Sequence, residues 1–157
     1  MLRTHRVASA LCALSVLCLD VGAAFAQARP RPTGLVLSSS AMHSCVTTAG
    51  GGLTCWGPNV MRALGPAPAT AVPRVLHRTG VAQAAVGADH TCVLLSDRTV
   101  FCQGASPGAT TVCEQSELGP LVCNPQPRAV PGLAGAVQIV AGQGFGCGRL
   151  ADGSVRC

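Results

Sequence analysis

The sequence predicts an all-β fold built from repeated antiparallel hairpins, and three observations carry this prediction. Three stretches of eighteen residues, 38–55, 85–102 and 140–157, each contain two cysteines with nine residues between them. The middle of each stretch reads as a turn between short apolar runs. The chain also contains 11 prolines and 19 glycines, and no sustained helical periodicity follows residue 26.

The first segment, residues 1–26, predicts a secretory signal peptide. Arg3 and Arg6 precede an apolar run that ends in Ala24-Phe25-Ala26, which favours cleavage before Gln27. The apolar run is too short to cross a bilayer as a helix, so we expect no membrane span after cleavage. The mature chain is then secreted, periplasmic or at the cell surface. Residues 27–34 follow as a proline-rich lead-in.

The hairpins are expected to place each cysteine pair face to face. Two strands folded about the central turn bring residues ten positions apart opposite each other, at a separation that a disulfide can bridge. Export to an oxidising compartment favours disulfides for the eight cysteines that follow the signal. The expected pairs are Cys45 with Cys55, Cys92 with Cys102, Cys113 with Cys123, and Cys147 with Cys157.

The segment 105–127 is a long connection that carries its own cysteine pair, Cys113 and Cys123. We interpret it as a loop closed by a disulfide that prevents disorder. A protruding loop of this kind would also be a natural place for a partner to bind.

Composition argues against nucleic acid as a partner. The mature chain would hold nine arginines and five acidic residues, a net charge of +4 without a lysine. Its arginines are scattered along the sequence, and the one tryptophan and three phenylalanines of the full sequence offer little stacking surface.

The motif His-x-Cys, a hairpin, Cys-Trp-Gly-x-Asn and a nearby Leu-Gly resembles the repeat of the regulator of chromosome condensation (RCC1) family, in a cysteine-bearing version of exported bacterial proteins. The third copy has Phe145 in place of the histidine and stops at Cys157. The repeat positions are His43, Trp56, Gly57, Asn59, Leu64 and Gly65 in the first copy, and His90, Leu118 and Gly119 in the second.

This resemblance implies an RCC1-like β-propeller of four-stranded antiparallel blades, of which the chain holds about two and a half, open or incomplete. The corresponding repeats are 35–80, 81–135 and a truncated 136–157. Exposed blade edges would then favour self-association, and Leu94, Val100, Ile139 and Val155 would lie on uncovered faces. Trp56 is expected in the core.

The resemblance implies a non-catalytic, protein-binding scaffold with an unidentified partner, and inhibition of a secreted enzyme is the most concrete precedent in the superfamily. No pattern predicts a cofactor, and the founding member's nucleotide-exchange activity is not carried over. Two other interpretations stay open: an enzyme or zinc protein that uses the His-x-Cys elements, and a non-functional fragment of a longer propeller. The run 104–108 fits G-x-S-x-G, but no histidine follows Ser106, so we expect a loop there.

Overall fold

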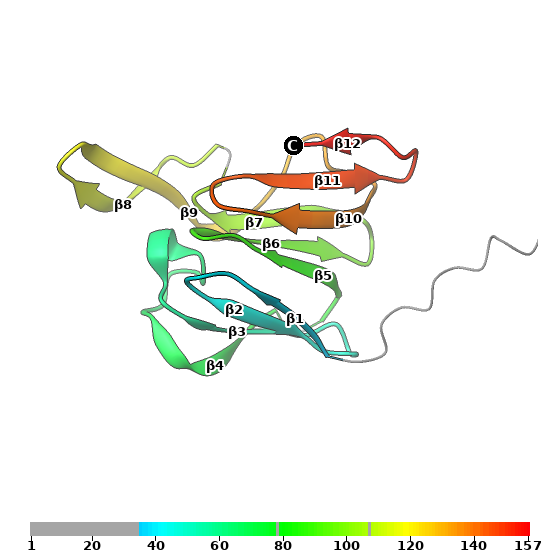
Figure 1. Cartoon of the computed structure of the whole chain (residues 1–157), viewed down its shortest axis with the longest axis horizontal. Coiled ribbons are helices and arrows are strands. Elements are labelled where there is room, and N and C mark those ends of the chain that lie inside the picture. Colours follow the sequence, from blue (N-terminus) through cyan, green and yellow to red (C-terminus); the bar gives the residue numbers. More distant parts are fainter. Residues whose placement is uncertain (1–34, 78, 107) are drawn as a thin grey trace, which may run out of the picture. The chain divides into compact units, whose positions relative to one another are not determined.

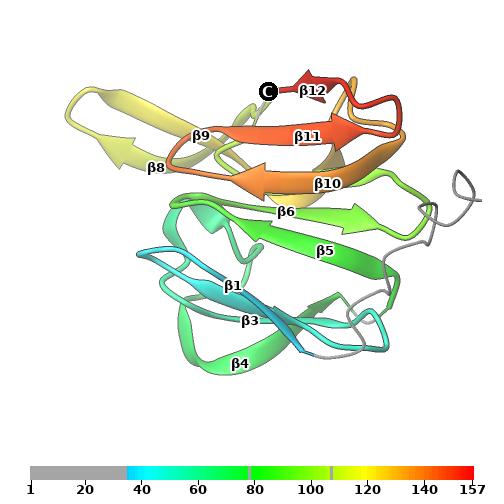
Figure 2. The same ribbon diagram turned by 45° about the vertical axis from the view of Figure 1, so that its right-hand side comes forward.

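The computed structural model describes residues 35–77, 79–106 and 108–157, which form three antiparallel sheets (Figure 1). The predicted signal peptide and lead-in, 1–34, lie outside the described residues. The sheet formed by residues 81–129 (sheet 2) lies between the sheet of residues 36–77 (sheet 1) and the sheet of residues 136–156 (sheet 3), as the turned view also shows (Figure 2). The expected all-β fold of antiparallel sheets is confirmed. In the part of the chain that the structure describes, no helix is long and apolar enough to cross a membrane.

Sheets 1 and 3 follow the chain in a meander, and in sheet 2 β9 lies between β7 and β8. Sheet 1 has the order β1 (Val36–Ser39), β2 (Ser44–Thr47), β3 (Leu53–Gly57), β4 (Thr70–His77), with the 3-10 helix η1 (Val60–Arg62) between the last two strands. Sheet 2 has the order β5 (Val81–Val86), β6 (His90–Leu95), β7 (Val100–Gly104), β9 (Gly119–Ala129), β8 (Thr111–Ser116). Sheet 3 has the order β10 (Ala136–Ala141), β11 (Gly146–Leu150), β12 (Val155–Arg156).

The central hairpin of each sheet carries a disulfide across its two strands. Cys45 pairs in register with Cys55, and Cys92 with Cys102, with 4.1 Å between the Cα atoms in both cases. Sheet 3 repeats this arrangement with Cys147 and Cys157, whose Cα atoms are 4.0 Å apart. The constant spacing in the sequence therefore reflects one hairpin geometry used three times.

The three hairpin turns need a left-handed backbone at the same position. Gly51 and Gly153 supply it in sheets 1 and 3 with φ of 75° and 88°, whereas sheet 2 places Arg98 there with φ of 68°. Asp97 supports the turn of sheet 2, because its carboxylate accepts hydrogen bonds from the Thr99 backbone N–H and hydroxyl. These two bonds lower the pKa of Asp97.

The hydrophobic core consists of two clusters, one between each pair of neighbouring sheets among the described residues. The first includes the Cys45–Cys55 disulfide, Leu53 and Leu64 from sheet 1, packed on Val86 and Val93 of sheet 2. The second includes the Cys92–Cys102 disulfide, Leu94 and Val100 from sheet 2, packed on Ile139 and Leu150 of sheet 3. Sheets 1 and 2 thus each turn their disulfide toward the following sheet.

This packing corrects one expectation about exposed faces. Leu94, Val100 and Ile139 are buried, because sheets 2 and 3 close on each other over them. Val155 is 63% exposed on β12, as expected for the outer part of sheet 3.

The long connection of sheet 2 is a hairpin and not a loop. β9 serves as the fourth strand of sheet 2, and its first half continues beyond the sheet to pair with β8. Figures 1 and 2 show this β8–β9 hairpin projecting from the three sheets. Cys113 and Cys123 join its two strands, with 5.8 Å between their Cα atoms.

Candidate functional site

The repeated histidine position lies on a four-residue turn that all three sheets share. In each turn a backbone N–H donates to the carbonyl oxygen three residues later: Ser40 to His43 at 3.0 Å, Gly87 to His90 at 2.9 Å, and Gly142 to Phe145 at 2.8 Å. In sheets 1 and 2 the turn places the last of these residues, His43 and His90, in a buried position beside the neighbouring sheet, whereas Phe145 is 60% exposed. Position 43 and its two equivalents are therefore the points where one sheet can form a side-chain contact with the next.

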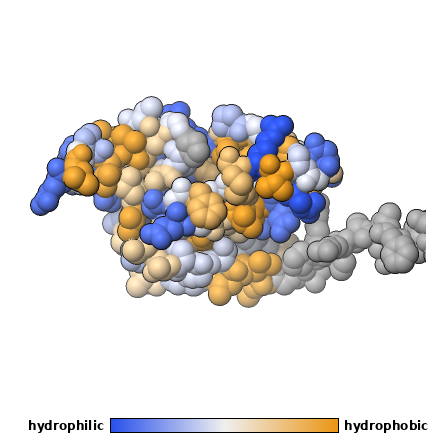
Figure 3. Space-filling view, turned by 45° about the horizontal axis from the view of Figure 1, so that its top comes forward, coloured by the Kyte–Doolittle hydropathy of each residue, from blue (hydrophilic) through white to orange (hydrophobic). Residues whose placement is uncertain are grey.

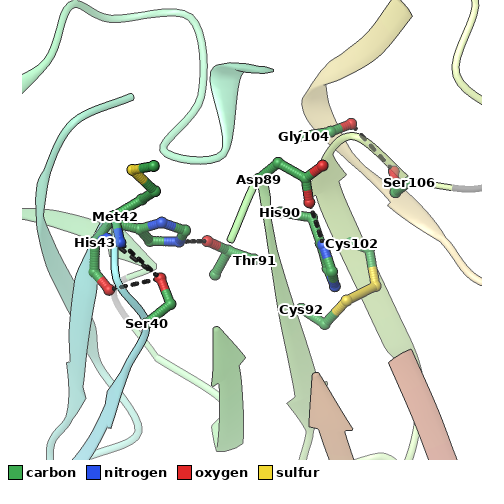
Figure 4. Close-up of polar contacts among 10 residues, drawn as sticks. All are labelled: Ser40, Met42, His43, Asp89, His90, Thr91, Cys92, Cys102, Gly104 and Ser106. Carbon is green, nitrogen blue, oxygen red and sulfur yellow. Dashed lines mark hydrogen bonds and ion pairs between the residues drawn. A yellow bond between two sulfur atoms is a disulfide. The ribbon is translucent and has the colours of Figure 1, made fainter. Parts of the chain in front are cut away.

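His43 is a buried link between sheets 1 and 2. Its side chain is 2% exposed, and Nε2 lies 2.7 Å from the Thr91 hydroxyl on β6 (Figure 4). Burial lowers the pKa of His43 to about 4, and the nearby His90 lowers it further in the same direction, while Asp89 opposes the change. His43 is thus neutral at neutral pH and acts as a hydrogen-bonding group within the fold.

His90 occupies the equivalent position but has different partners. Its Nδ1 lies 3.0 Å from the Asp89 carboxylate, and the ring is 4% exposed. Sheet 3 has Gly146 where sheet 2 has Thr91, so no hydroxyl reaches Nε2 from that position. Figure 4 shows the ring between Asp89 and the Cys92–Cys102 disulfide, with Nε2 turned away from the carboxylate.

The zinc interpretation requires thiolates that this structure does not offer. The cysteines of both His-x-Cys elements are the disulfide partners Cys45 and Cys92. Within the described ranges, no three side chains of His, Cys, Asp or Glu come together in a way that could hold a metal ion. The histidines instead bond to Thr91 and Asp89.

The G-x-S-x-G run has no triad geometry around Ser106. The Ser106 hydroxyl lies 3.4 Å from the Gly104 carbonyl oxygen, to which it donates, and accepts a hydrogen bond of 2.9 Å from the Asn124 amide. The Asp89–His90 pair lies at the start of β6, and no hydrogen bond joins it to Ser106 (Figure 4). This arrangement does not provide the base that a serine nucleophile needs.

The Trp-Gly-x-Asn…Leu-Gly motif of the first copy organises the chain after β3. The Asn59 side chain accepts the Leu64 N–H at 2.7 Å and donates to the Gly65 carbonyl oxygen at 2.8 Å, which closes the turn around η1. Gly57 has φ of 124°, and a Cβ there would meet the Met42 carbonyl oxygen at 2.7 Å. The motif is therefore structural, and Leu64 belongs to the core.

Three residues of the motif differ from their expected roles. Trp56 is only half-buried, so it is not the core residue that the sequence predicts. Leu118 and Gly119 are not the counterparts of Leu64 and Gly65, because they form the tip of the β8–β9 hairpin and Leu118 is fully exposed. In the sequence this Leu-Gly pair follows the second hairpin as Leu64-Gly65 follows the first, but in the structure it belongs to the inserted β8–β9 hairpin.

The projecting β8–β9 hairpin presents apolar and acidic side chains together. Figure 3 shows hydrophobic residues on this projection, next to a hydrophilic tip. Val112 and Val122 are cross-strand neighbours. The exposed apolar residues of the hairpin are Val112, Leu118, Leu121 and Val122.

The hairpin is anchored on η1 through Glu114 and carries both glutamates of the chain. The Glu114 carboxylate accepts the backbone N–H of Met61 in η1 at 3.3 Å, which joins the hairpin to sheet 1. Glu117 lies exposed at the tip. The sequence signal for this hairpin was the nine-residue spacing of Cys113 and Cys123, which equals that of the three central hairpins.

Comparisons with known proteins agree with the repeat. The model of the regulator of chromosome condensation (RCC1) repeat matches residues 81–106, the first three strands of sheet 2. No curated protein sequence matches the chain. Similar solved structures include yeast RCC1 (Prp20) bound to Kap60, with 16% identity over 76% of this chain and 30% of that one and a TM-score of 0.62.

Human WBSCR16 is a second similar structure, with 23% identity, coverage of 77% of this chain and 33% of that one, and a TM-score of 0.60. Prp20p from Saccharomyces cerevisiae, described with its binding to Gsp1p and histones, has 16% identity, coverage of 76% and 32%, and a TM-score of 0.57. The chain spans about a third of the length of these structures. The predicted resemblance to RCC1-like propellers and the partial-propeller fold are confirmed.

Proposed function

We propose that this chain is an exported, non-catalytic scaffold that binds a protein through its β8–β9 hairpin. The observation that carries the proposal is the exposure of four apolar side chains on a hairpin that is held by a disulfide and anchored on η1. Small apolar patches on a monomer commonly mark interaction sites. A hairpin fixed in this way also loses little conformational freedom on binding.

The fold supports the same conclusion. Solved structures of similar fold include one of yeast RCC1 bound to Kap60, and another described with binding to Gsp1p and histones. These partners belong to those proteins, and for this chain they support only the general class of a protein partner. The hairpin carries exposed apolar side chains as well as Glu114 and Glu117, and this combination favours a partner with an apolar groove and basic residues at its rim.

Self-association is a second candidate, favoured by the outer strand of sheet 1. Leu35 is 74% exposed and Leu37, on β1, is 65% exposed, and the free edge of β1 has no strand partner among the described residues. Exposed apolar edges promote pairing between chains. Light scattering on the purified mature chain separates the candidates, since self-association predicts an oligomer and the hairpin proposal requires none.

Capture of partners by the purified chain tests the hairpin proposal. The double variant Leu118→Asp with Val122→Asp places charge on the apolar surface, and we expect it to retain less than about a tenth of the protein that the parent chain binds from exported material. Val72→Asp is the matched control, because Val72 is equally apolar and is exposed on β4. Equal capture by the parent and the double variant would overturn the role of the hairpin.

The enzyme and zinc alternative has its own test. Thiol titration of the purified mature chain should find no free cysteine, and metal analysis should find no stoichiometric zinc, because the cysteines form disulfides. Free thiols together with bound zinc would favour the alternative. Intact-mass measurement of exported material tests the predicted start at Gln27.

A further inference from the structure

A cavity of about 490 Å³ is lined by residues of sheet 2, of sheet 3 and of the connection between them. Its wall is largely apolar and includes both the Cys92–Cys102 and the Cys147–Cys157 disulfides. Aliphatic side chains complete most of the wall, and the ring of Phe145, which is 60% exposed, lies at its rim. The aliphatic lining residues include Val100, Val130, Leu133 and Ile139.

One buried polar group faces this space. His90 lines the cavity and is 4% exposed, and its Nδ1 is occupied by the Asp89 carboxylate at 3.0 Å. Nε2 makes no hydrogen bond with any residue that the structure describes. A Cβ built on Gly146, on the opposite side in β11, would lie 3.9 Å from this nitrogen.

The equivalent place between sheets 1 and 2 is filled. There Nε2 of His43 bonds to the Thr91 hydroxyl at 2.7 Å. Thr91 and Gly146 occupy the same repeat position, directly before Cys92 and Cys147. The change from threonine to glycine therefore removes both the atoms that would fill the space and the hydroxyl that would pair with the histidine.

We propose that this cavity binds a small apolar compound that carries one hydroxyl group, such as an alkylphenol. The hydroxyl takes the place that the Thr91 hydroxyl has beside His43, and the hydrocarbon part rests on the two disulfides and the aliphatic wall. A cavity of this size with a convergent polar group has the features of small-molecule sites.

The hydrogen-bonding direction selects the ligand class. A carboxylate only accepts, so the Nδ1 of His90 carries the proton that points to Asp89. In the neutral tautomer that this bond selects, Nε2 carries the lone pair, so a ligand hydroxyl donates to it. A hydroxyl donates without adding a charge to a wall that is apolar apart from His90, Ser106 and Arg156.

Calorimetric titration of the full purified chain with 4-propylphenol, and with its methyl ether 4-propylanisole, tests the proposal. The two probes have similar hydrocarbon parts, but only the phenol can donate to Nε2. We expect the phenol to bind about fivefold more tightly or better, the effect of one net hydrogen bond. Equal affinities for phenol and ether, or no binding of the phenol, would overturn the proposal.

The repeat itself supplies the matched variants. Gly146→Thr introduces the residue that sheet 2 has at this position, Thr91. It should weaken phenol binding at least tenfold, since the threonine hydroxyl and methyl occupy the site. The new Cβ has ordinary van der Waals spacing to its neighbours. Gly50→Thr, in the turn of sheet 1, adds the same side chain in open surroundings and should leave the affinity unchanged. Unchanged affinity in Gly146→Thr would place the phenol elsewhere.

A second variant keeps the test decisive if Gly146→Thr does not fold. His90→Phe introduces the residue that the third copy has at this position, Phe145. It should erase the preference for phenol over ether. The reverse change, Thr91→Gly, should create a second phenol site beside His43. A preference for the phenol that persists in His90→Phe would exclude His90 as the acceptor.

Discussion

The contact between sheets 1 and 2 and the contact between sheets 2 and 3 use the same repeat positions with different chemistry. The first is bridged by side chains: His43 bonds to Thr91, and the Ser38 hydroxyl accepts the Val86 N–H at 3.2 Å. The second has no bond between two side chains among the described residues: the Gln83 amide donates to the Ile139 carbonyl oxygen at 2.8 Å and accepts the Ile139 N–H at 2.9 Å.

The difference lies in how closely the two backbones approach. A Cβ on Gly87 would meet the Gly142 carbonyl oxygen at 2.7 Å, so sheets 2 and 3 touch main chain to main chain at the turn. In sheet 1 the equivalent residue is Ser40, whose hydroxyl accepts the backbone N–H groups of Met42 and His43. A repeat can thus keep its strand geometry while individual contacts change from side chain to backbone, or are left open as a cavity.

The largest expected effect on stability comes from Gly87→Ser, which gives sheet 2 the residue that sheet 1 has at the equivalent position, Ser40. The new Cβ would lie 2.3 Å from the His90 ring and 2.7 Å from the Gly142 carbonyl oxygen. We expect a loss of about 3 kcal/mol in the free energy of unfolding, the upper range for overpacking. Urea denaturation measures it, with Gly50→Ser as the control. A loss no greater than that of the control would show that the close contact is not a constraint.

Acid should weaken the contact between sheets 1 and 2 through His43. Its pKa is about 4 in the folded chain and 6.5 in the unfolded chain, so unfolding takes up a proton between these values. The contribution of His43 is fully present above about pH 6.5 and is lost as the pH falls toward 4, by on the order of 3 kcal/mol.

The variant His43→Phe isolates this contribution. Denaturation at several pH values should give a flatter profile than the parent chain. Burial also lowers the pKa of His77 on β4, so part of the acid sensitivity should remain in the variant. An unchanged profile would mean that His43 is not the group responsible.

The smallest expected effect is that of Gln83→Val, which introduces the residue of sheet 1 at the equivalent position, Val36. The register supports this equivalence, since Val36 pairs with Thr47 and Gln83 with Leu94, each two residues after a cysteine. Loss of two partly buried hydrogen bonds should lower the free energy of unfolding by about 1 kcal/mol. Gln138→Val, on the exposed side of sheet 3, should change stability less. Equal effects of the two substitutions would contradict the proposed backbone tie.

The sequence by itself determined the hairpins, because their signals are local. Ten positions separate the cysteines of each pair, and a turn at the centre is enough to bring them opposite each other. The RCC1-like resemblance also followed from short motifs such as Cys55-Trp56-Gly57, and it predicted the antiparallel sheets. The same local signal is present in Cys113 and Cys123, although the segment was interpreted as a loop.

Only the tertiary structure decided which faces are covered and which polar groups are paired. Leu94 and Ile139 are buried because sheet 3 packs on sheet 2, and the residues of a single repeat do not show that the two sheets pack together. His43 and His90 have the same sequence context, His-x-Cys, yet one is paired with the next sheet and the other faces a cavity. The reason is that the residues facing these histidines, Thr91 and Gly146, lie about fifty residues further along the chain. They come close to the histidines only when the sheets stack.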